Sequence, residues 1–347
     1  MEKPKILVVG SFVMDQFAST GVVPNEGETV LGLEFSKAPG GKGANQAVQA
    51  ARLGAKVDMF GKLGFDSNGQ EMLDACRASG VGMDYVVRDE ALPSGCSVVI
   101  LEVQPGGQTK NRIIVIPGAN LSITARETEF LKARLSEYDL VMLQLEIPME
   151  INELVAAWAS ELKVPVMLNP APSAELSDDF LSHLTYISPN EHEAQDLSGI
   201  RLDRGADGAL DMEKVREAAG VLQKRGAKNV LITLGDMGAA YLDEDGCFTS
   251  VPAAKGIRAV DPTAAGDSFV AAFCYGMASG WDGEKALRFA AHTAGLTVTG
   301  KGALPSLLQW SGSRTSWPRS GRIERTCLRT GNFLGGILDV ERTYERL

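Results

Sequence analysis

Short, unbroken apolar runs alternate with longer segments of helical periodicity, and this alternation constrains the fold more than any other feature. The apolar runs lie at residues 5–10, 57–61, 140–143, 165–169, 186–188 and 230–234. Helical patterns cover residues 43–53, 67–79, 150–162, 212–225, 265–277 and 284–299, and a further helix begins at Glu191. Apolar runs of this length, separated by helices, are typical of buried parallel strands. The sequence therefore predicts an α/β fold in which helices cover both faces of a mostly parallel sheet.

Two segments break the alternation. Residues 28–35 (ETVLGLEF) alternate with period two, and residues 97–103 and 112–116 form a hairpin-like pair around 105–107 (PGG). Such period-two segments predict strands. Because they are inserted between strand–helix units, we expect a small antiparallel lid over the mouth of the main sheet, with its strands within about 12–38 and 94–117.

The charge balance argues against nucleic acids and anionic membranes as partners. Lysine and arginine total 34 against 44 aspartate and glutamate, a net charge of −10, and there is no long basic run. Any anionic ligand must then be bound by a local group of hydrogen-bond donors or positive charges, because the net charge of the chain does not attract it. The apolar stretch at residues 6–14 is too short for a bilayer span of about 20 residues. The charged residues before this stretch, Glu2, Lys3 and Lys5, are compatible with a signal peptide. Asp15 ends the stretch, however, which favours a buried first strand.

The cysteines and the end of the chain bear on compartment and domain limits. The five cysteines are widely spaced with no Cys-x-x-Cys pair, which favours free thiols in a reducing cytosol: Cys76, Cys96, Cys247, Cys274 and Cys327. Residues 307–347 contain seven arginines and no lysine, unlike the rest of the chain. We expect one domain over residues 1–306 and a divergent, poorly ordered tail over 307–347 outside the core.

A glycine-rich segment, residues 40–45 (GGKGAN), immediately precedes the alanine-rich helix. Glycines let the backbone approach a ligand, and the helix start offers free N–H groups. Lys42 and Asn45 are candidate donors to hydroxyl groups. The segment is neither a Walker loop nor a dinucleotide fingerprint, because Gly43 follows Lys42 and Gln46 follows at the third-glycine position. A tight turn into a helix is the alternative interpretation.

A second segment, residues 261–269 (DPTAAGDSF), opens the helix at 265–277. Small residues and Gly266 at a helix N-terminus expose N–H groups that suit a phosphate or a developing anion. Asp267 is a candidate catalytic carboxylate. Its alternative role is a helix-dipole partner, which contributes about 0.3–1 kcal/mol.

Several polar residues lie at the carboxyl ends of the predicted parallel strands, where open α/β sheets bind ligands. They are Asp15, Glu146, Asn190, Glu193 and the loop 233–238. Asn190 alone is explained by a helix cap, and Gly235 and Gly238 alone are explained by a turn. Their common edge indicates a ligand site.

In this order the motifs resemble the phosphofructokinase-B-like carbohydrate kinase family, in its ribokinase branch. The resemblance rests on residues 40–47 (GGKGANQA), Asn190-x-x-Glu193, residues 233–238 (TLGxxG) and residues 261–267 (DPTAAGD), and it covers roughly residues 3–306. The family fold is a three-layer α/β/α sandwich with a β lid, often paired with the lid of a second subunit. The resemblance thus implies a cytoplasmic, homodimeric sugar kinase.

The resemblance also implies roles for individual residues. The γ-phosphoryl group of ATP passes to a primary sugar hydroxyl, with Asp267 as the base and the backbone of Ala264, Ala265 and Gly266 as the anion hole. The implied sugar-binding residues are Asp15, Gly41, Lys42, Gly43, Ala44, Asn45, Glu146 and Asp267. The implied ATP-binding residues are Asn190, Glu193, which orders Mg²⁺ through water, Thr233, Leu234, Gly235, Asp236, Met237, Gly238, Gly266 and Asp267. The implied monovalent-cation site, for which K⁺ is expected, is Asp261, Thr263, Thr297, Gly300, Gly302 and Ser306.

The sequence departs from the family pattern at two places. Val13 stands where these kinases carry an asparagine that binds the sugar, and the chain after Ser306 lacks the usual closing helix. A site without that amide discriminates hydroxyl patterns less. Ribose is the leading substrate, and deoxyribose, fructose, a ketodeoxy sugar acid or a nucleoside are alternatives. A non-catalytic sugar or nucleotide sensor is the alternative of another class, whereas no fingerprint supports a dinucleotide-dependent oxidoreductase.

Overall fold

The computed structural model describes residues 2–104, 109–205, 208–309 and 324–327. Its main sheet has ten strands in the order β14-β13-β12-β11-β10-β9-β8-β1-β4-β5. Pairing is parallel from β11 through β5 and antiparallel from β11 to β14. The strands are β1 Lys5–Val9, β4 Lys56–Gly64, β5 Val81–Asp89, β8 Leu140–Gln144, β9 Val166–Asn169, β10 Tyr186–Ile187, β11 Asn229–Thr233, β12 Ala239–Leu242, β13 Cys247–Val251 and β14 Glu324–Cys327.

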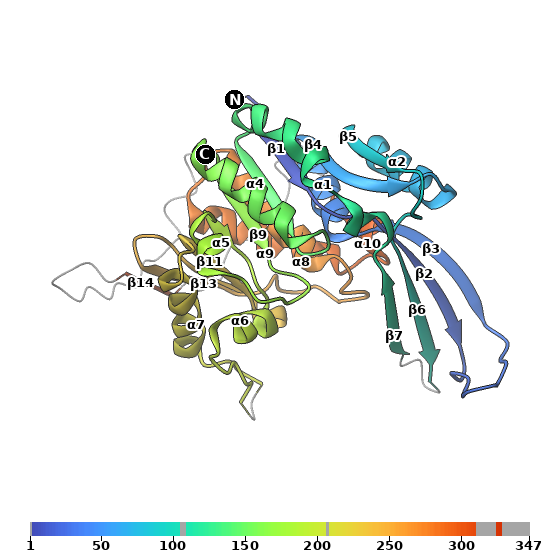
Figure 1. Ribbon diagram of the computed structural model, residues 1–347. Coiled ribbons are helices and arrows are strands. Elements are labelled where there is room, and N and C mark those ends of the chain that lie inside the picture. The colour runs from blue at the N-terminus through green and yellow to red at the C-terminus, as the bar shows by residue number, and fades with distance from the viewer. Residues whose placement is uncertain (1, 105–108, 206–207, 310–323, 328–347) are drawn as a thin grey trace.

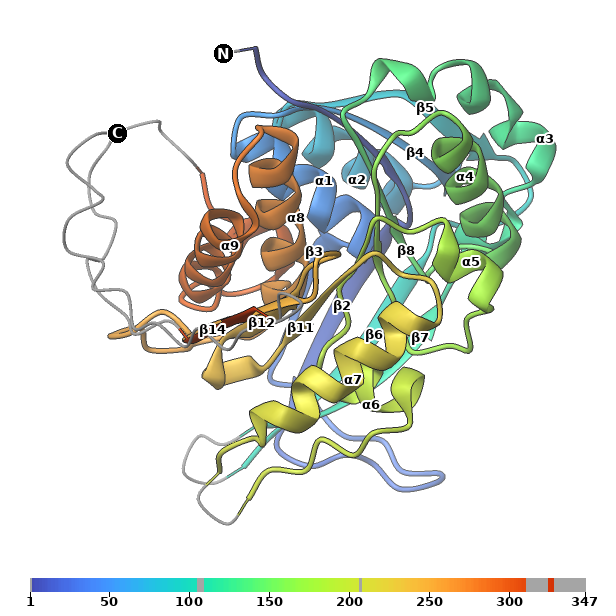
Figure 2. The same ribbon diagram turned by 90° about the vertical axis from the view of Figure 1, so that its left-hand side faces the viewer.

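Helices cover both faces of this sheet (Figure 2). One face carries α1 Lys42–Arg52, α2 Ser67–Ala78, α8 Ala265–Ala278 and α9 Gly283–Thr297. The other carries α4 Met149–Glu161, α5 Asp178–Ser182, α6 Glu191–Ser198 and α7 Met212–Lys224. Alternate residues of β1 enter the two cores: Ile6 and Val8 the first, Leu7 and Val9 the second. The predicted α/β sandwich with a mostly parallel sheet is confirmed.

Short elements complete the chain. They are α3 Ala125–Thr128, α10 Ala303–Ser306 and the 3₁₀ turns η1 Gly118–Ser122, η2 Glu129–Ala133, η3 Leu135–Glu137 and η4 Gly235–Met237.

A separate four-stranded sheet projects from one side of the body (Figure 1). Its order is β3-β2-β6-β7, formed by β3 Glu34–Gly40, β2 Val13–Thr20, β6 Cys96–Val103 and β7 Thr109–Ile116. The β2–β3 and β6–β7 pairs are antiparallel as expected, whereas β2 and β6 are parallel. The predicted lid is therefore present with one parallel pairing. The segment 105–107, expected at the hairpin turn, lies outside the described residues.

The strand expected at residues 28–35 is wrong over most of its length, because β3 begins only at Glu34. Residues 25–28 instead form a turn: Glu28 N–H donates to Asn25 O at 3.0 Å, and Gly27 has φ 77°. Leu31 and Leu33 are 92% and 66% exposed, and only Val30 in this segment is half-buried, so little of it is covered. Without a buried face, alternation alone does not specify a strand.

The folded core extends beyond the expected boundary at Ser306. Leu307 is 3% exposed and belongs to the first core, and Leu308 packs against it. Gln49 of α1 binds both backbone groups of Leu308, and Arg52 donates to Leu307 O at 3.0 Å. The backbone of β14 adds an edge strand beside β13, so this part of the Arg-rich segment joins the main sheet rather than lying outside it.

Cys76, Cys96 and Cys274 are free thiols, as expected. Cys247 is disulfide-bonded, so the expectation of free thiols is wrong for this residue. None of the helices in the described ranges combines the length and apolar character needed to cross a membrane.

Candidate active site

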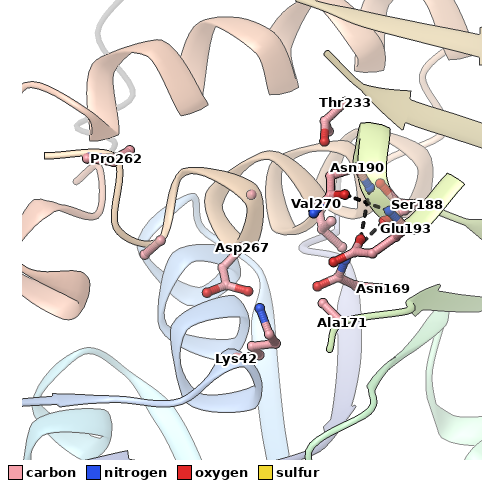
Figure 3. A pocket seen from close by; sticks show the side chains of 12 residues that line it. Lys42, Asn169, Ala171, Ser188, Asn190, Glu193, Thr233, Pro262, Asp267 and Val270 are labelled. Atoms are coloured by element: carbon pink, nitrogen blue, oxygen red, sulfur yellow. Dashed lines mark hydrogen bonds between the residues drawn. The ribbon is translucent and has the colours of Figure 1, made fainter. Parts of the chain in front are cut away.

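A cavity of about 260 Å³ opens at the carboxyl ends of the parallel strands β9, β10 and β11 and at the N-terminus of α8 (Figure 3). Its walls are largely polar, and α1 contributes one basic group. The lining residues are Lys42, Asn169, Ala171, Ser188, Asn190, Glu193, Thr233, Pro262, Ala264, Gly266, Asp267 and Val270.

Asp267 lies in the first turn of α8 and is 7% exposed. Its carboxylate accepts one hydrogen bond on each oxygen: Asn45 Nδ2 lies 2.8 Å from Oδ2, and Gln46 Nε2 lies 3.1 Å from Oδ1. Both donors come from the first turns of α1. A carboxylate held on both oxygens is fixed in position before any ligand arrives.

Lys42 and Asp267 point toward one another in the cavity (Figure 3). Burial disfavours the charged form of Lys42, but the carboxylates of Asp267, Glu146 and Glu193 more than offset this, and the pKa of Lys42 lies above its ordinary value. Lys42 is thus an ammonium ion at neutral pH, placed where it can face a ligand phosphate or hydroxyl.

The N-terminus of α8 offers backbone donors. Ala264 caps the helix in the left-handed region, with φ 62°. Ala265 N–H already donates to Pro262 O at 3.2 Å, so this expected anion-hole donor is occupied. Among the described residues, the N–H groups of Ala264, Gly266 and Asp267 have no partner. A side chain at Gly266 would project into open space, so the glycine leaves this helix start accessible.

The two glycines around Lys42 let α1 begin directly against the β1–β2 connection. Gly41 has φ 95°, and a Cβ atom on Gly43 would lie 2.4 Å from Ser11 N. The close approach lets one Glu146 oxygen accept from both Lys42 N–H (2.9 Å) and Ser11 Oγ (2.5 Å). Glu146, after β8, is thereby placed beside the start of α1.

Ala44 does not take the expected sugar-binding position. Its side chain is buried in the first core, and its N–H donates to Ser11 O at 3.0 Å.

Asp15 reaches the site from lid strand β2, and it accepts a hydrogen bond from Ser97 Oγ of β6. Burial raises the pKa of Asp15; the Ser97 bond opposes this, and the negative charges of Glu146 and Asp267 add to it. Three carboxylates thus gather where the lid meets the main sheet. Val13, two residues before Asp15, is buried and has no polar side-chain atom to add.

Asn190 and Glu193 form a capping box at the start of α6: Glu193 N–H donates to Asn190 Oδ1 (2.9 Å), and Asn190 N–H donates to Glu193 Oε2 (2.8 Å). Burial raises the pKa of Glu193, while the Asn190 N–H and Lys42 act against it. Asn190 also pairs with Thr233 as an isolated bridge, which brings the ends of β10 and β11 to the same wall.

The loop expected to contact ATP lies mostly outside the cavity. Thr233 lines the cavity, but Leu234 is buried, Asp236 pairs with Arg204, and Met237 packs against the second core. Gly235 and Gly238 both have positive φ, at 55° and 105°, and form the turn around η4. A Cβ atom on Gly238 would lie 2.0 Å from Val251 O, so this glycine serves packing against β13.

Most of the residues expected at a monovalent-cation site come together beside α8. Asp261 accepts from the N–H and hydroxyl of Thr263 and from Gly302 N–H, and these bonds outweigh burial and lower the pKa of Asp261. A Cβ atom on Gly300 would lie 2.8 Å from Ser306 Cβ. Thr297 is the exception: its hydroxyl donates to Thr293 O within α9 and lies 2.7 Å from Ser268 Oγ.

Sequence reasoning missed several site residues. Asn169 and Ser188 line the cavity, and Gln46 and Gln144 support Asp267 from behind. Asn169 and Gln144 are the last residues of β9 and β8, and Ser188 follows β10 directly. Asn190 and Glu146 were predicted because they follow parallel strands. Asn169, Gln144 and Ser188 also lie at the ends of parallel strands, so the same rule applies to these three residues.

The sandwich, the lid and a carboxylate beside an open helix N-terminus define an α/β enzyme of the small-molecule kinase class. The chain belongs to the pfkB family of carbohydrate kinases, whose family model matches residues 3–310.

Individual relatives agree with this assignment. The chain is 40% identical to the ribokinase of Schizosaccharomyces pombe over 318 residues, covering 89% of this chain and 97% of that protein. It is 37% identical to the ribokinase of Bacillus subtilis, covering 86% and 94%. Among solved structures, Arabidopsis thaliana ribokinase complexed with ribose and ATP matches with a TM-score of 0.79 and 33% identity, covering 88% of this chain and 96% of that chain.

Proposed function

We propose that the chain transfers the γ-phosphoryl group of ATP to the primary hydroxyl of D-ribose, giving ADP and D-ribose 5-phosphate. The hydroxyl oxygen forms the new bond to phosphorus, the bond between the γ-phosphorus and the ADP oxygen breaks, and the hydroxyl proton passes to Asp267. The observation that carries the proposal is the Asp267 carboxylate, held by Asn45 and Gln46 beside the unpartnered N–H groups of Gly266 and Asp267. The chemistry needs this combination of a fixed base and fixed donors for developing negative charge.

The sugar subsite is assigned to the junction between the lid and α1. Asp15 and Glu146 offer carboxylate acceptors, and Lys42 and Asn45 offer donors. Gly41 and Gly43 let the start of α1 pack against the β1–β2 connection, which places these groups at one junction. A sugar with several hydroxyl groups matches this alternation of donors and acceptors.

The ATP subsite is assigned to the wall formed by Asn190, Glu193 and Thr233. No cluster of three or more His, Cys, Asp or Glu side chains that suits a metal is found in the described ranges. Mg²⁺ bound with ATP needs no such cluster, because it keeps several waters and one or two carboxylates and takes its other ligands from the phosphates. Glu193, a buried carboxylate on the cavity wall, fits this role. When bound, Mg²⁺ neutralises phosphate charge.

A monovalent cation, K⁺ by preference, is assigned to the loops at Asp261, Thr263, Gly300, Gly302 and Ser306. The support is the Asp261 carboxylate just before α8, which accepts hydrogen bonds from the Thr263 hydroxyl and from Gly302 N–H and has a lowered pKa. Thr297 is assigned through its backbone carbonyl, because its hydroxyl bonds to both Thr293 O and Ser268 Oγ.

The lid is assigned as the contact with a second copy of the chain, giving a homodimer. Every residue of β7 is exposed, including the consecutive apolar residues Ile113, Ile114, Val115 and Ile116. Four adjacent apolar residues expose both faces of an edge strand, a feature that soluble proteins cover. Sedimentation of the wild type and of Ile114→Lys tests this assignment; equal masses at the monomer value contradict it. A cytoplasmic location, where ATP is supplied, completes the proposal and is tested by fractionation.

A panel of sugars tests the reaction. ATP consumption and sugar phosphate formation are measured with D-ribose, 2-deoxy-D-ribose and D-fructose, with and without Mg²⁺, in K⁺ or Na⁺. We expect Mg²⁺-dependent turnover that is fastest on ribose in K⁺. Faster turnover on another sugar contradicts ribose as the substrate. Binding of ribose and ATP without turnover supports the sensor alternative instead.

A further inference from the structure

Two buried glutamines from different elements connect the interior of the sheet to Asp267. Gln144 ends β8 and Gln46 lies in α1, and neither side chain is accessible to solvent. Gln144 Nε2 donates to Gln46 Oε1 at 2.7 Å. Gln46 Nε2 donates to Asp267 Oδ1 at 3.1 Å and to Asn169 Oδ1 at 3.3 Å. Both donor hydrogens and the acceptor oxygen of the Gln46 amide are therefore used.

The direction of this chain of bonds follows from its end. An ionised carboxylate only accepts hydrogen bonds, so Gln46 must turn its NH₂ group toward Asp267. The Gln46 oxygen then faces Gln144, which must present its own NH₂ group. Only this polarity satisfies every contact, and it leaves Gln144 Oε1 buried without a partner. A buried unpaired oxygen costs about 1–3 kcal/mol, so the arrangement is maintained against its own stability.

Gly10 and Gly43 create the space for the chain. A Cβ atom on Gly10 would lie 2.1 Å from Gln144 Oε1 and 2.9 Å from Gly43 Cα. Any side chain at residue 10 would push Gln144 away from Gln46. The end of β1 and the start of α1 are thus shaped around this amide pair.

We propose that Gln46 is a positioning residue for Asp267, and that Gln144 fixes the orientation in which Gln46 does this. The inference rests on the proposed function, in which Asp267 accepts the sugar proton. Asn45 holds Oδ2 and Gln46 holds Oδ1, so together they fix the plane of the carboxylate. Each oxygen keeps a lone pair for the incoming hydroxyl. Loss of Gln46 frees the carboxylate to rotate and lowers the rate of proton transfer without removing a contact to sugar or ATP.

The test is the substitution Gln46→Met, which keeps the length of the side chain and removes its amide. We expect kcat to fall about 10²-fold, as a misplaced reacting group costs, while KM for ribose and for ATP stays within about twofold. Gln144→Met should also lower kcat, by less, because Gln46 then loses the contact that orients it. The double variant should be no slower than Gln46→Met alone, since both act through one chain of bonds.

Gln49→Met is the matched control. Gln49 lies three residues further along α1, is equally buried, and bonds to Leu308 and Ser268 instead of Asp267. The same substitution there should lower the melting temperature and leave kcat within about twofold. A kcat loss in Gln49→Met equal to that in Gln46→Met would show a general packing effect and overturn the proposal.

Two further outcomes overturn it. One is an unchanged kcat in Gln46→Met; should that variant not fold, an unchanged kcat in Gln144→Met overturns the proposal instead. The other is a double variant whose loss is the product of the single losses. Asp267→Asn is measured in parallel to separate the two proposals. If Asp267→Asn keeps turnover, the proposed role of Asp267 is wrong. If Asp267→Asn loses turnover while the glutamine variants keep it, only the inference about Gln46 is wrong.

Discussion

Asn45 and Asp267 are separated by 222 positions in the sequence, and Asn45 Nδ2 lies 2.8 Å from Asp267 Oδ2. The contact joins the start of α1 to the start of α8, two helices on the same face of the main sheet. The glycine-rich segment and the aspartate segment, each recognisable in the sequence without the other, therefore form one wall. The proposed hydroxyl-binding side chain and the proposed base are therefore direct neighbours.

The first prediction concerns Asp267→Asn. The amide cannot accept the hydroxyl proton, so we expect kcat to fall about 10²–10⁴-fold, the usual contribution of a general base. KM for ATP should change little. Asp282→Asn, which retains the cap at the start of α9, is the control and should match the wild type. Steady-state kinetics with ribose measures both, and wild-type turnover in Asp267→Asn would remove this residue as the base.

The second prediction concerns Glu146→Ala. Glu146 accepts from Ser11 Oγ and Lys42 N–H, and its loss removes an acceptor at the sugar subsite. A hydrogen bond to a charged group contributes about 1.5–3 kcal/mol, so KM for ribose should rise at least about tenfold. KM for ATP should hold. Glu150→Ala, at an exposed residue in the first turn of α4, is the control. An unchanged KM for ribose in Glu146→Ala argues against its assignment to the sugar subsite.

The main sheet could be predicted because its strands are buried on both faces. β1 sends alternate residues into the two cores, which requires the unbroken apolar run seen in the sequence. Helix ends were also readable, since Gly54 and Gly80 follow α1 and α2 with positive φ. The segment 28–35 failed because nothing covers it, so its alternation carries no information on burial.

Much of the site could be predicted from the position of its residues at strand ends and helix starts, but the contacts that support these residues could not be predicted. Asp267, Asn190 and Glu193 lie on the cavity, as expected from strand ends and helix starts. Gln46 is one of three amide residues in an alanine-rich helix, and Gln144 is the single amide residue of an apolar strand. Each resembles an ordinary polar residue until the packing of α1 against β8 brings the two amides within 2.7 Å. Only the tertiary structure reveals that pair.

The third prediction concerns Arg204, whose guanidinium binds Glu191 and Asp236 at 2.7 Å each and Leu234 O at 3.2 Å. These bonds tie η4 to the start of α6. Each of the two ion pairs contributes about 0.2–1 kcal/mol, so Arg204→Ala should raise KM for ATP about two- to thirtyfold and leave KM for ribose unchanged. Arg201→Ala, which loses only an exposed pair with Asp203, is the control. If both variants raise KM for ATP equally, the proposed connection between η4 and the start of α6 through Arg204 is wrong.

The fourth prediction concerns pH and Asp15. Burial raises the pKa of Asp15 above the ordinary 3.8, so the folded state holds this proton more tightly than the unfolded state. Its contribution to stability is full below the unfolded pKa and is lost as pH rises through the folded pKa. Asp15→Asn does not titrate, so its melting temperature relative to wild type should increase as pH rises from about 4 to 7. Thermal unfolding without ligands measures this, and a difference that is independent of pH contradicts it.

The last prediction places the end of the folded unit. A chain ending at Gln309 keeps Leu307 in the core and the bonds of Leu308 to Gln49 but loses the edge strand β14, so its kcat should match the full chain and its melting temperature should fall only slightly. A chain ending at Ser306 loses both. Burying a leucine contributes about 1.5–3 kcal/mol, so this shorter chain should melt several degrees lower.

The two chains differ by only three residues, so the comparison separates core packing from any effect of the remaining tail. Loss of Leu307 also removes the acceptor that Arg52 shares with Leu304 O, which loosens α1 at its last turn. Asn45 and Gln46 lie in the first half of α1, away from Arg52, so the shorter chain should lose stability and keep kcat within about twofold, as expected for Gln49→Met. If the chain ending at Gln309 melts as low as the one ending at Ser306, the packing of Leu307 and Leu308 does not stabilise the domain.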